Sequence, residues 1–505
     1  MSTTGVPISP PPERSPGGDG SPGGTPAGKR AGGAGAALRR WIVPLGVGAV
    51  LSALPHPPGL AASAWHYVAL FAAVVAALIV APLPAAACAL IGVSIAAAFQ
   101  MVEHGAAAST KWGLSGFAND TVWLIFAAYM FADAYAKTGL GRRIALALVA
   151  RMGGNSLGLG YAIALADGIL APFTPSNTAR SGGTIFPIIA NIPPLYGSNP
   201  GPTARKIGTY LMTVAFAATC VTSTLFLTAL APNLLVMDFA QKIAGVHVSW
   251  MTWFIGIAPV GILLFLAVPP VVYLLERPEI SRSAEIPAWA KAELAKTGPL
   301  TRREIVLAAA VAGALALWIG GGALVSATVV ALGVVAVLLL CGVLTWDDVL
   351  ANRAAWGVLV WFGALVALAD GLAKVGVLAW LSHGAAAHLV GLPLFPLLAA
   401  AVALFFLVHY GFASLTAQAT ALYPVLLGAL VAIPGVPPTT ASLALAYGMG
   451  LMGVLTPYAC GPAPIYAHGG YIPNRDFWRT GAVLGGLFLV VLIVIGLPWL
   501  LWTVH

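Results

Sequence analysis

The chain has 505 residues, of which 59% are hydrophobic and only 8% are charged, and its mean hydropathy is +0.92. A soluble domain is about 45–50% apolar and about 25% charged, so this composition excludes an ordinary water-soluble protein. The formal net charge of +8 does not indicate nucleic acid as a partner, because the basic residues form no stripe interleaved with aromatic side chains. Most of the surface is therefore expected to face a lipid bilayer.

Residues 1–40 are predicted to form a disordered cytoplasmic tail. The segment is rich in glycine, proline and serine and has no apolar periodicity, a composition that does not support a packed core. It is too long and too polar for the start of a signal peptide, and no cleavage motif follows the first apolar run. Its excess of basic residues places it on the cytoplasmic side of the membrane.

Apolar segments long enough to cross about 30 Å of hydrocarbon follow the tail. We predict eleven transmembrane helices, near residues 41–60, 65–82, 84–102, 119–136, 206–230, 252–275, 305–320, 322–343, 354–373, 440–460 and 482–503. The charged segment 276–304 separates a first half, 41–275, from a second half, 305–505. We interpret it as a linker at the cytoplasmic interface.

Two further apolar segments, 155–192 and 388–426, do not fit simple spans. The first contains Pro172, Pro175 and a polar run in its middle. Proline breaks a helix and leaves backbone polar groups that lipid cannot satisfy. Both segments are predicted to form re-entrant hairpins whose tips are buried in protein, although periodicity alone also allows two short helices joined by a loop.

The distribution of basic residues indicates an orientation. Counted from a cytoplasmic N-terminus, the basic residues expected inside are Lys137, Arg142, Arg143, Arg205, Lys206, Arg353, Arg475 and Arg479. Those expected outside are Lys111, Lys242 and Lys374. This bias agrees with eleven crossings and two hairpins, with the C-terminus outside the cell.

The chain also repeats itself. Three short matches occur in the same order, between residues 132–139 and 369–376, 176–179 and 414–417, and 253–256 and 478–481, at offsets of 237, 238 and 225. The first pair of segments is separated by an odd number of predicted crossings, so the two copies run in opposite directions. An inverted repeat with interrupted apolar segments is typical of a secondary transporter that binds its substrate at the repeat interface.

The hairpin tips are the candidate binding site for a carboxylate. Helix ends at broken segments expose free N–H groups that attract anions. The tips add neutral hydrogen-bond donors, namely Ser176, Asn177, Thr178, Ser414 and Thr416. Two related tips would suit a substrate with two carboxylates. The alternative is that these hydroxyls only satisfy backbone groups within the helices.

Arg180 is the most informative charge near the tips. A guanidinium near the membrane midplane is costly unless it has a partner, and no acidic residue lies within ten positions of it. It is predicted to pair with the substrate anion or to complete the site electrostatically, with snorkelling to the interface as the alternative. His409 and Tyr410, just before the second tip, are possible accessory residues.

Known enzyme motifs are absent from the sequence. It contains no Walker A, HExxH or GxSxG motif, and its four cysteines have neither CxxC nor Cys/His spacing. We therefore expect neither an enzyme, nor a structural metal, nor a bound cofactor. An intramembrane aspartyl protease that uses Asp133 and Asp370 is a remote alternative.

The segment from Pro175 to Pro187 resembles the first hairpin signature of the divalent anion/sodium symporter family. Residues 121–126, His409-Tyr410 with 414–416, and 461–466 support this resemblance, which covers most of residues 40–505. The nearest branch holds plastid 2-oxoglutarate/malate translocators and bacterial citrate or tartrate/succinate antiporters.

The resemblance implies an all-α homodimer that works as an elevator in the inner membrane. It also implies that two unwound helices line the site, at Thr228 to Asn233 and Cys460 to Pro464, which adds Thr228, Gly461 and Pro462 to the substrate-binding residues. Sodium-coupled members keep asparagine in both tips. This chain has asparagine only in the first tip, so the resemblance implies at most a single sodium site, near Ser176 and Asn177.

The second tip departs from this pattern because it has Leu415, and leucine cannot coordinate a cation. Arg180 would then supply the charge that sodium supplies elsewhere, which favours obligatory exchange of C4–C5 di- or tricarboxylates such as malate, succinate, 2-oxoglutarate or citrate. A further departure is Gln418, where exchangers of this branch often have histidine. A sodium- or proton-coupled dicarboxylate symporter is the alternative function.

Overall fold

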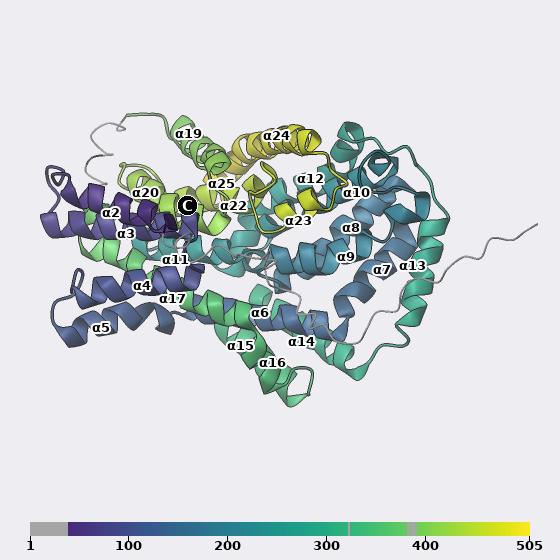
Figure 1. Cartoon of the computed structure of the whole chain (residues 1–505), viewed down its shortest axis with the longest axis horizontal. Helices are drawn as coiled ribbons and strands as arrows, with labels where there is room; N and C mark the ends of the chain where they lie inside the picture. The colour runs from purple at the N-terminus through teal and green to yellow at the C-terminus, as the bar shows by residue number, and fades with distance from the viewer. Residues whose placement is uncertain (1–38, 322–323, 381–383, 385–390, 505) are drawn as a thin grey trace, which may run out of the picture.

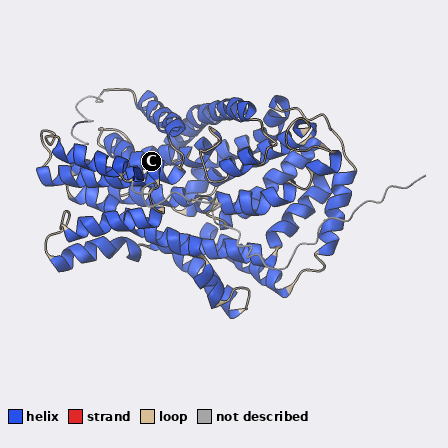
Figure 2. Cartoon of the chain, in the orientation of Figure 1, coloured by secondary structure: helices blue, strands red, loops and turns tan. Residues whose placement is uncertain are grey.

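The computed structural model describes residues 39–321, 324–380, 384 and 391–504, so nearly all of the predicted tail lies outside the described residues. Within these ranges the regular structure is helical, and the only β-pairing is an isolated bridge between Asn155 and Arg282 (Figure 2). Eight helices in the described ranges are long and apolar enough to cross a membrane. These features confirm an all-α, polytopic membrane protein.

Each predicted span contains a helix in the structure. These helices are α2 (Ile42–Ala53), α3 (Ala62–Val80), α4 (Ala85–Ala98), α6 (Asp120–Thr138), α10 (Gly208–Leu225), α12 (Trp250–Leu275), α14 (Arg302–Gly320), α15 (Ala327–Leu340), α17 (Arg353–Lys374), α21 (Pro438–Ala446), and α24 (Asn474–Val491) with α25 (Leu497–Thr503). Several of them are shorter than a full span, and two of the eight long apolar helices belong to the predicted hairpins. The number of crossings therefore stays a prediction.

The predicted boundary of the first span is wrong. We expected a helix to about residue 60, but α2 ends at Ala53. Pro55, Pro57 and Pro58 follow directly. Proline lacks the N–H that a continuing helix needs, and it disfavours helical geometry in the residue before it.

Helices that the apolar pattern did not predict connect the long ones. They are α5 (Ala106–Ser115), α7 (Leu140–Met152), α11 (Ala231–Ala244), α13 (Glu285–Lys296) and α16 (Trp346–Ala351). The predicted linker 276–304 contains α13, which packs on α7 and runs crosswise to the long helices at one end of the molecule (Figure 1). This crosswise position agrees with an interfacial helix.

Charged residues that were predicted on one side of the membrane meet in the structure. The ion pairs are Arg142–Glu293 at 2.7 Å, Arg143–Glu304 at 2.7 Å, Arg479–Glu276 at 2.6 Å and Arg205–Asp476 at 2.6 Å. All four arginines were expected inside, and all three glutamates belong to the linker. Their contact supports the relative placement of these segments, while the compartment that they face remains a prediction.

The fully buried helix α10 lies at the centre of the fold. It packs against α12, against α8 (Ser156–Leu170) and against α22 (Gly448–Leu451), and every one of its residues is buried. Because no face of α10 meets lipid, its threonine and serine side chains can point at neighbouring protein segments. Several of them face the first hairpin.

Close packing of α17 against the short helix η1 (Gly116–Ala118) gives a test of the fold. A Cβ atom at Gly116 would overlap the carbonyl oxygen of Gly363, a backbone atom that cannot move without shifting the helix. We expect Gly116→Ala to lower the free energy of unfolding by about 1–3 kcal/mol. Gly333→Ala in α15, where the space is open, is the matched control. Equal thermal unfolding of the two variants in detergent would contradict this packing.

Candidate functional site

The first predicted hairpin has a helix–tip–helix form. Its first arm is α8, which continues as a 3-10 turn, η2 (Ala171–Phe173), and then becomes extended at Thr174. The chain returns as a π-helical segment, η3 (Thr178–Ile185), and α9 (Phe186–Ile189). Pro172 and Pro175 explain the break, since neither can donate the hydrogen bond of a continuing helix. Its re-entrant character stays a prediction.

The second predicted hairpin has the same order of elements. Here α19 (Leu394–Leu407) leads into a 3-10 turn, η7 (Val408–Gly411), and the chain returns as α20 (Leu415–Val431). The two 3-10 turns are separated along the sequence by nearly the same number of residues as the two copies of the repeated tip residues. The local geometry of the two hairpins is therefore similar as well as their sequence.

Ser176 and Ser414 occupy equivalent positions at the two tips. The Ser176 hydroxyl accepts a hydrogen bond from the Ala179 N–H at 3.2 Å, and the Ser414 hydroxyl accepts one from the Ala417 N–H at 3.3 Å. Each serine thus caps the start of a return helix, which is the structural role that the sequence left open. A hydroxyl that accepts in this way still has its own proton to donate.

Polar side chains of both tips are partly exposed in the structure. Thr178 is exposed, while Ser176, Ser414 and Thr416 are partly exposed. Asn177 is only 6% exposed. The accessible polar groups of the tips are therefore mainly hydroxyls.

A broken helix lies beside the first tip. Between α10 and α11, Phe226 and Leu230 are extended, and residues 227–229 form a 3-10 turn. The break that the resemblance implied, Thr228 to Asn233, ends earlier in the structure because Ala231 already begins α11. Pro232 suits the first turn of this helix, where its missing N–H has no partner to lose.

Thr228 joins this break to the first hairpin. Its hydroxyl donates to the carbonyl of Pro172 at 2.5 Å and accepts from the Trp250 indole at 3.2 Å. The residue is buried, with 1% of its surface exposed. Thr228 therefore braces the tip in this structure, with its hydroxyl already engaged.

The second break, residues 455–462, reaches the first tip. It lies between η8 (Met452–Val454) and α23 (Ala463–His468), so Pro464 is helical and does not belong to it. A Cβ atom at Gly461 would overlap the hydroxyl of Thr178. Pro462 is buried directly behind Gly461. The structure thus brings Thr178 and Gly461 together.

Arg180 is buried and fully bonded to the protein. Its Nε donates to Asp167 at 3.1 Å, and its Nη1 donates to the carbonyls of Thr174 at 2.8 Å and Ala229 at 3.0 Å. Its Nη2 donates to the hydroxyl of Ser223 at 2.9 Å, with Thr219 and Thr222 both at 3.4 Å.

These bonds argue against the prediction that Arg180 pairs directly with the substrate anion. The acidic partner is Asp167, thirteen positions upstream, and therefore outside the range considered in the sequence. In the described structure every guanidinium N–H has a protein acceptor, so none is left for a substrate carboxylate. The Thr174 and Ala229 carbonyls both accept hydrogen bonds from Arg180, and the sodium site beside Ser176 and Asn177 stays a prediction.

His409 makes a comparable link in the second hairpin. Its ring nitrogens lie 2.5 Å from the Gln418 side-chain oxygen and 2.8 Å from the Ala459 carbonyl. Ala459 begins an Ala-x-x-Pro sequence in the second break, as Ala229 does in the first. His409 and Arg180 thus each bind the alanine carbonyl of a broken helix. Tyr410, by contrast, is exposed and stacks on Trp478.

Two residues near the tips were missed in the sequence. Asp167 pairs with Arg180, and Tyr466 bonds the Ser181 hydroxyl at 2.8 Å. Asp167 was the more detectable, because it is an acidic residue inside an apolar hairpin arm. Tyr466 lies in the segment 461–466 that supports the family resemblance, but nothing in the sequence indicated its bond to Ser181.

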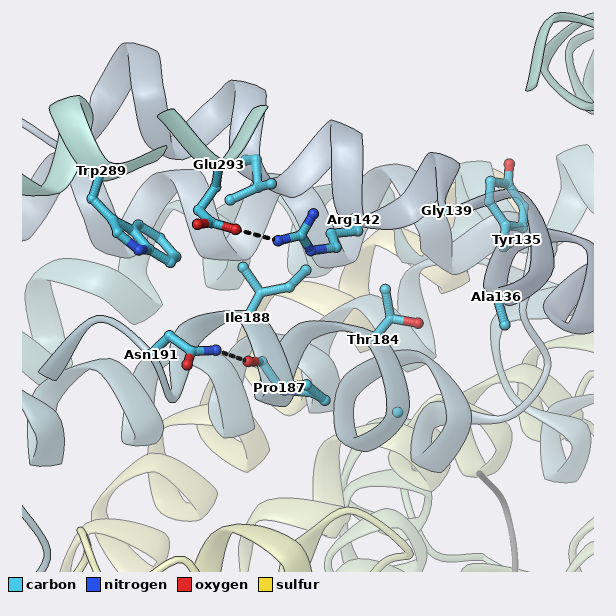
Figure 3. Close-up of a pocket in the computed structure, with 12 residues that line it drawn as sticks. Tyr135, Ala136, Gly139, Arg142, Thr184, Pro187, Ile188, Asn191, Trp289 and Glu293 are labelled. Atoms are coloured by element: carbon cyan, nitrogen blue, oxygen red, sulfur yellow. Dashed lines mark hydrogen bonds and ion pairs between the residues drawn. The ribbon is translucent and has the colours of Figure 1, made fainter. Parts of the chain in front are cut away.

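A cavity of about 580 Å³ lies beside the first hairpin (Figure 3). It is lined by α6, α7, α13 and the return arm of the hairpin, and it does not include the tip residues Ser176 to Thr178. Arg142 and Glu293 form an ion pair in its wall. Lys296 and Arg142 lower the pKa of Glu293, so this carboxylate remains ionised near neutral pH.

Comparisons with known proteins identify a family and relatives that the chain resembles. A family model described as the sodium:sulfate symporter transmembrane region matches residues 36–504. The chain is 44% identical over 474 residues to the L-tartrate/succinate antiporter of Shigella sonnei, covering 91% of this chain and 97% of the relative. The L-tartrate/succinate antiporter of Escherichia coli strain K12 matches equally, at 44% identity with the same coverage.

A solved structure resembles the fold. The crystal structure of the YdaH transporter of Alcanivorax borkumensis aligns with a TM-score of 0.51 at 17% sequence identity. The alignment covers 77% of this chain and 87% of the YdaH chain. At this identity the likeness concerns the fold alone.

The contact between Thr178 and Gly461 gives a test of the site. We expect Gly461→Ala to push the first tip away from the second break and to reduce uptake of labelled succinate into dicarboxylate-loaded proteoliposomes at least about tenfold. Thr178→Ala should restore part of the uptake when added to Gly461→Ala, because it removes the overlapping hydroxyl.

Gly411→Ala is the matched control, since open space surrounds Gly411 near the second tip. Full uptake by Gly461→Ala, or an equal loss in Gly411→Ala, would show that this contact does not matter for transport.

Proposed function

The chain belongs to the sodium:sulfate symporter family, and from this membership we propose that it is a multi-pass carrier that exchanges one C4 dicarboxylate for another across the cell membrane. The observation that carries the proposal is the 44% identity, along nearly the whole chain, to relatives named L-tartrate/succinate antiporters. The aligned region covers 91% of this chain. This identity supports a transporter rather than an enzyme.

The chemistry of the tips suits these substrates. Tartrate and succinate each carry two carboxylates on a four-carbon chain. In the proposed site, Ser176, Asn177 and Thr178 bind one carboxylate, and Ser414 and Thr416 bind the other, with Gly461 and Pro462 contributing their backbone. Hydroxyl donors and helix N-termini stabilise such anions without a fixed charge. Transport of malate, 2-oxoglutarate or citrate remains a prediction.

Arg180, Thr228 and His409 receive a bracing role in this proposal. Each makes a hydrogen bond to a carbonyl next to a tip or within a break. They hold the broken helices in place, while the exposed hydroxyls bind the substrate.

Exchange is favoured over sodium-coupled uptake. Leu415 offers no ligand at the second tip, and Arg180 already bonds the carbonyls of Thr174 and Ala229 at the first. A protease dyad is disfavoured because Asp133 accepts from Asn352 at 2.9 Å, whereas Asp370 pairs with Lys374 at 3.4 Å. A dyad would need the two carboxylates to share one proton.

The family resemblance extends the proposal to an elevator-type homodimer. The moving part would consist of the two hairpins and the two broken helices, which contact one another. Helices α6 and α17 would belong to the static part. The N-terminus is proposed to lie in the cytoplasm of the cell and the C-terminus outside it.

Uptake into proteoliposomes tests the function directly. We expect labelled succinate to enter vesicles preloaded with succinate or tartrate, with no dependence on sodium, and not to enter empty vesicles. Protein-free vesicles loaded in the same way are the control. Sodium-dependent entry into empty vesicles would identify a symporter, and proton-driven entry into them would identify a proton-coupled carrier.

The proposed hydroxyl ligands make a second prediction. Thr178→Val and Thr416→Val remove one donor each at nearly constant volume, and we expect each to raise the KM for succinate exchange about three- to tenfold, since one hydrogen bond contributes about 1 kcal/mol. Thr110→Ala is the control, because the Thr110 hydroxyl lies on the exposed α5 and bonds the Ala106 carbonyl. An unchanged KM in both valine variants would remove these residues from the site.

A further inference from the structure

Asp167 is a buried carboxylate in the first arm of the first hairpin. It has no exposed surface, and one of its oxygens binds Arg180 Nε at 3.1 Å and also accepts from the Thr222 hydroxyl. Its other oxygen, Oδ1, is buried without a hydrogen-bond partner. A carboxylate is rarely buried with an unsatisfied oxygen unless a nearby cation needs it.

The ion pair removes the net charge of Arg180. Neither side chain reaches solvent, with side-chain exposures of 0% for Arg180 and 1% for Asp167. In such a low-dielectric environment an uncompensated unit charge acts strongly over several ångströms. Whether the first tip presents a cation to the substrate therefore depends on Asp167.

The second hairpin supports the importance of charge balance. At the offset of 238 residues, Arg180 corresponds to Gln418 and Asp167 corresponds to Phe405. The Gln418 side chain donates to the Phe405 backbone carbonyl at 2.5 Å, whereas Arg180 donates to the side-chain carboxylate of Asp167. One repeat thus holds an ion pair where the other holds an uncharged pair, and the net charge of both pairs is zero.

We propose that Asp167 is a positioning residue for the exchange reaction, which holds Arg180 against the Ala229 carbonyl and cancels its charge so that neutral donors bind the dicarboxylate. This inference rests on the proposed exchange function. An exchanger must release its substrate on each side of the membrane in every cycle. A dianion bound next to an uncompensated guanidinium would be held too tightly to leave quickly, because tighter binding of the ground state does not speed the transport step.

The proposal predicts that substitutions of Asp167 and of Arg180 change the affinity for succinate in opposite directions. Asp167→Asn leaves the cation uncompensated, so the KM for succinate exchange should fall about tenfold or more, with a similar fall in kcat. Arg180→Gln leaves a buried anion, so KM should rise about tenfold or more. The double variant Asp167→Asn with Arg180→Gln is neutral again, and its KM should return to within about threefold of the original protein.

Glu276 provides a matched control. It is also a buried carboxylate, it pairs with Arg479 at 2.6 Å, and its Oε2 likewise has no hydrogen-bond partner. It lies at the end of α12, away from the tips. Glu276→Gln should leave KM unchanged. Asp167→Glu keeps the negative charge, so its KM should stay within about threefold of that of the original protein. This should hold even if the variant is produced in smaller amounts.

The measurements are KM and kcat for succinate exchange in proteoliposomes, together with thermal unfolding of each variant in detergent. Loss of kcat or stability at unchanged KM in Asp167→Asn would assign a purely structural role and overturn the proposal. So would an equal KM shift in Glu276→Gln. If the original protein carried out sodium-dependent uptake instead, the proposed function would fail, yet the order of KM values among the variants would still test the charge balance.

Discussion

Unsatisfied backbone groups are the constraint on which this structure depends. Two helices break inside a chain that faces lipid, and lipid offers no partner for the carbonyls that each break exposes. The chain supplies these partners from buried side chains, with Arg180 bonded to Ala229, Thr228 bonded to Pro172 and His409 close to Ala459. The breaks can persist only because these donors are present, and the breaks in turn leave the free helix ends that suit an anion. Function and stability therefore share the same hydrogen bonds.

Much of the fold was predictable because the bilayer imposes simple rules on sequence. Segment length, proline positions and the internal repeat were sufficient to predict helices in every expected span and the helix–tip–helix form near Ser176 and Ser414. The contacts were harder to predict because they join residues that are distant in sequence. The contact between Thr178 and Gly461 joins the first hairpin to the second break, which lies far along the chain, and Asp167 was overlooked because a hairpin tip separates it from Arg180. Helices α7 and α13 were missed because their charged sequences lack an apolar run long enough to cross a membrane.

The structure changes the interpretation of Arg180, the charged residue near the first tip. Taken alone, Arg180 suggests a fixed cation that attracts the substrate and forbids the return of an empty carrier. Once Asp167 is included, the pair is neutral, and in the proposed site the hydroxyls and helix ends would provide most of the attraction. Obligatory exchange would then depend less on a fixed charge than on the cost of leaving the helix ends and tip hydroxyls without an anion. Either substrate removes this cost when it binds, so the carrier could cross the membrane with one substrate or the other but not empty, as exchange requires.

The arrangement of polar contacts also favours one boundary for movement. Arg180 ties α8, the first tip, α10 and the first break into one cluster through six hydrogen bonds. Individual side-chain bonds join α11 to α6 and α17, and they include Asn119, the N-cap of α6, with Asp238 at 2.6 Å and Lys242 with the Val366 carbonyl at 3.1 Å. A buried network with many bonds resists rearrangement, whereas single contacts at an edge can exchange for others. If the carrier moves as a body, the cluster around Arg180 would travel intact, and the contacts of α11 with α6 and α17 would be the ones that break.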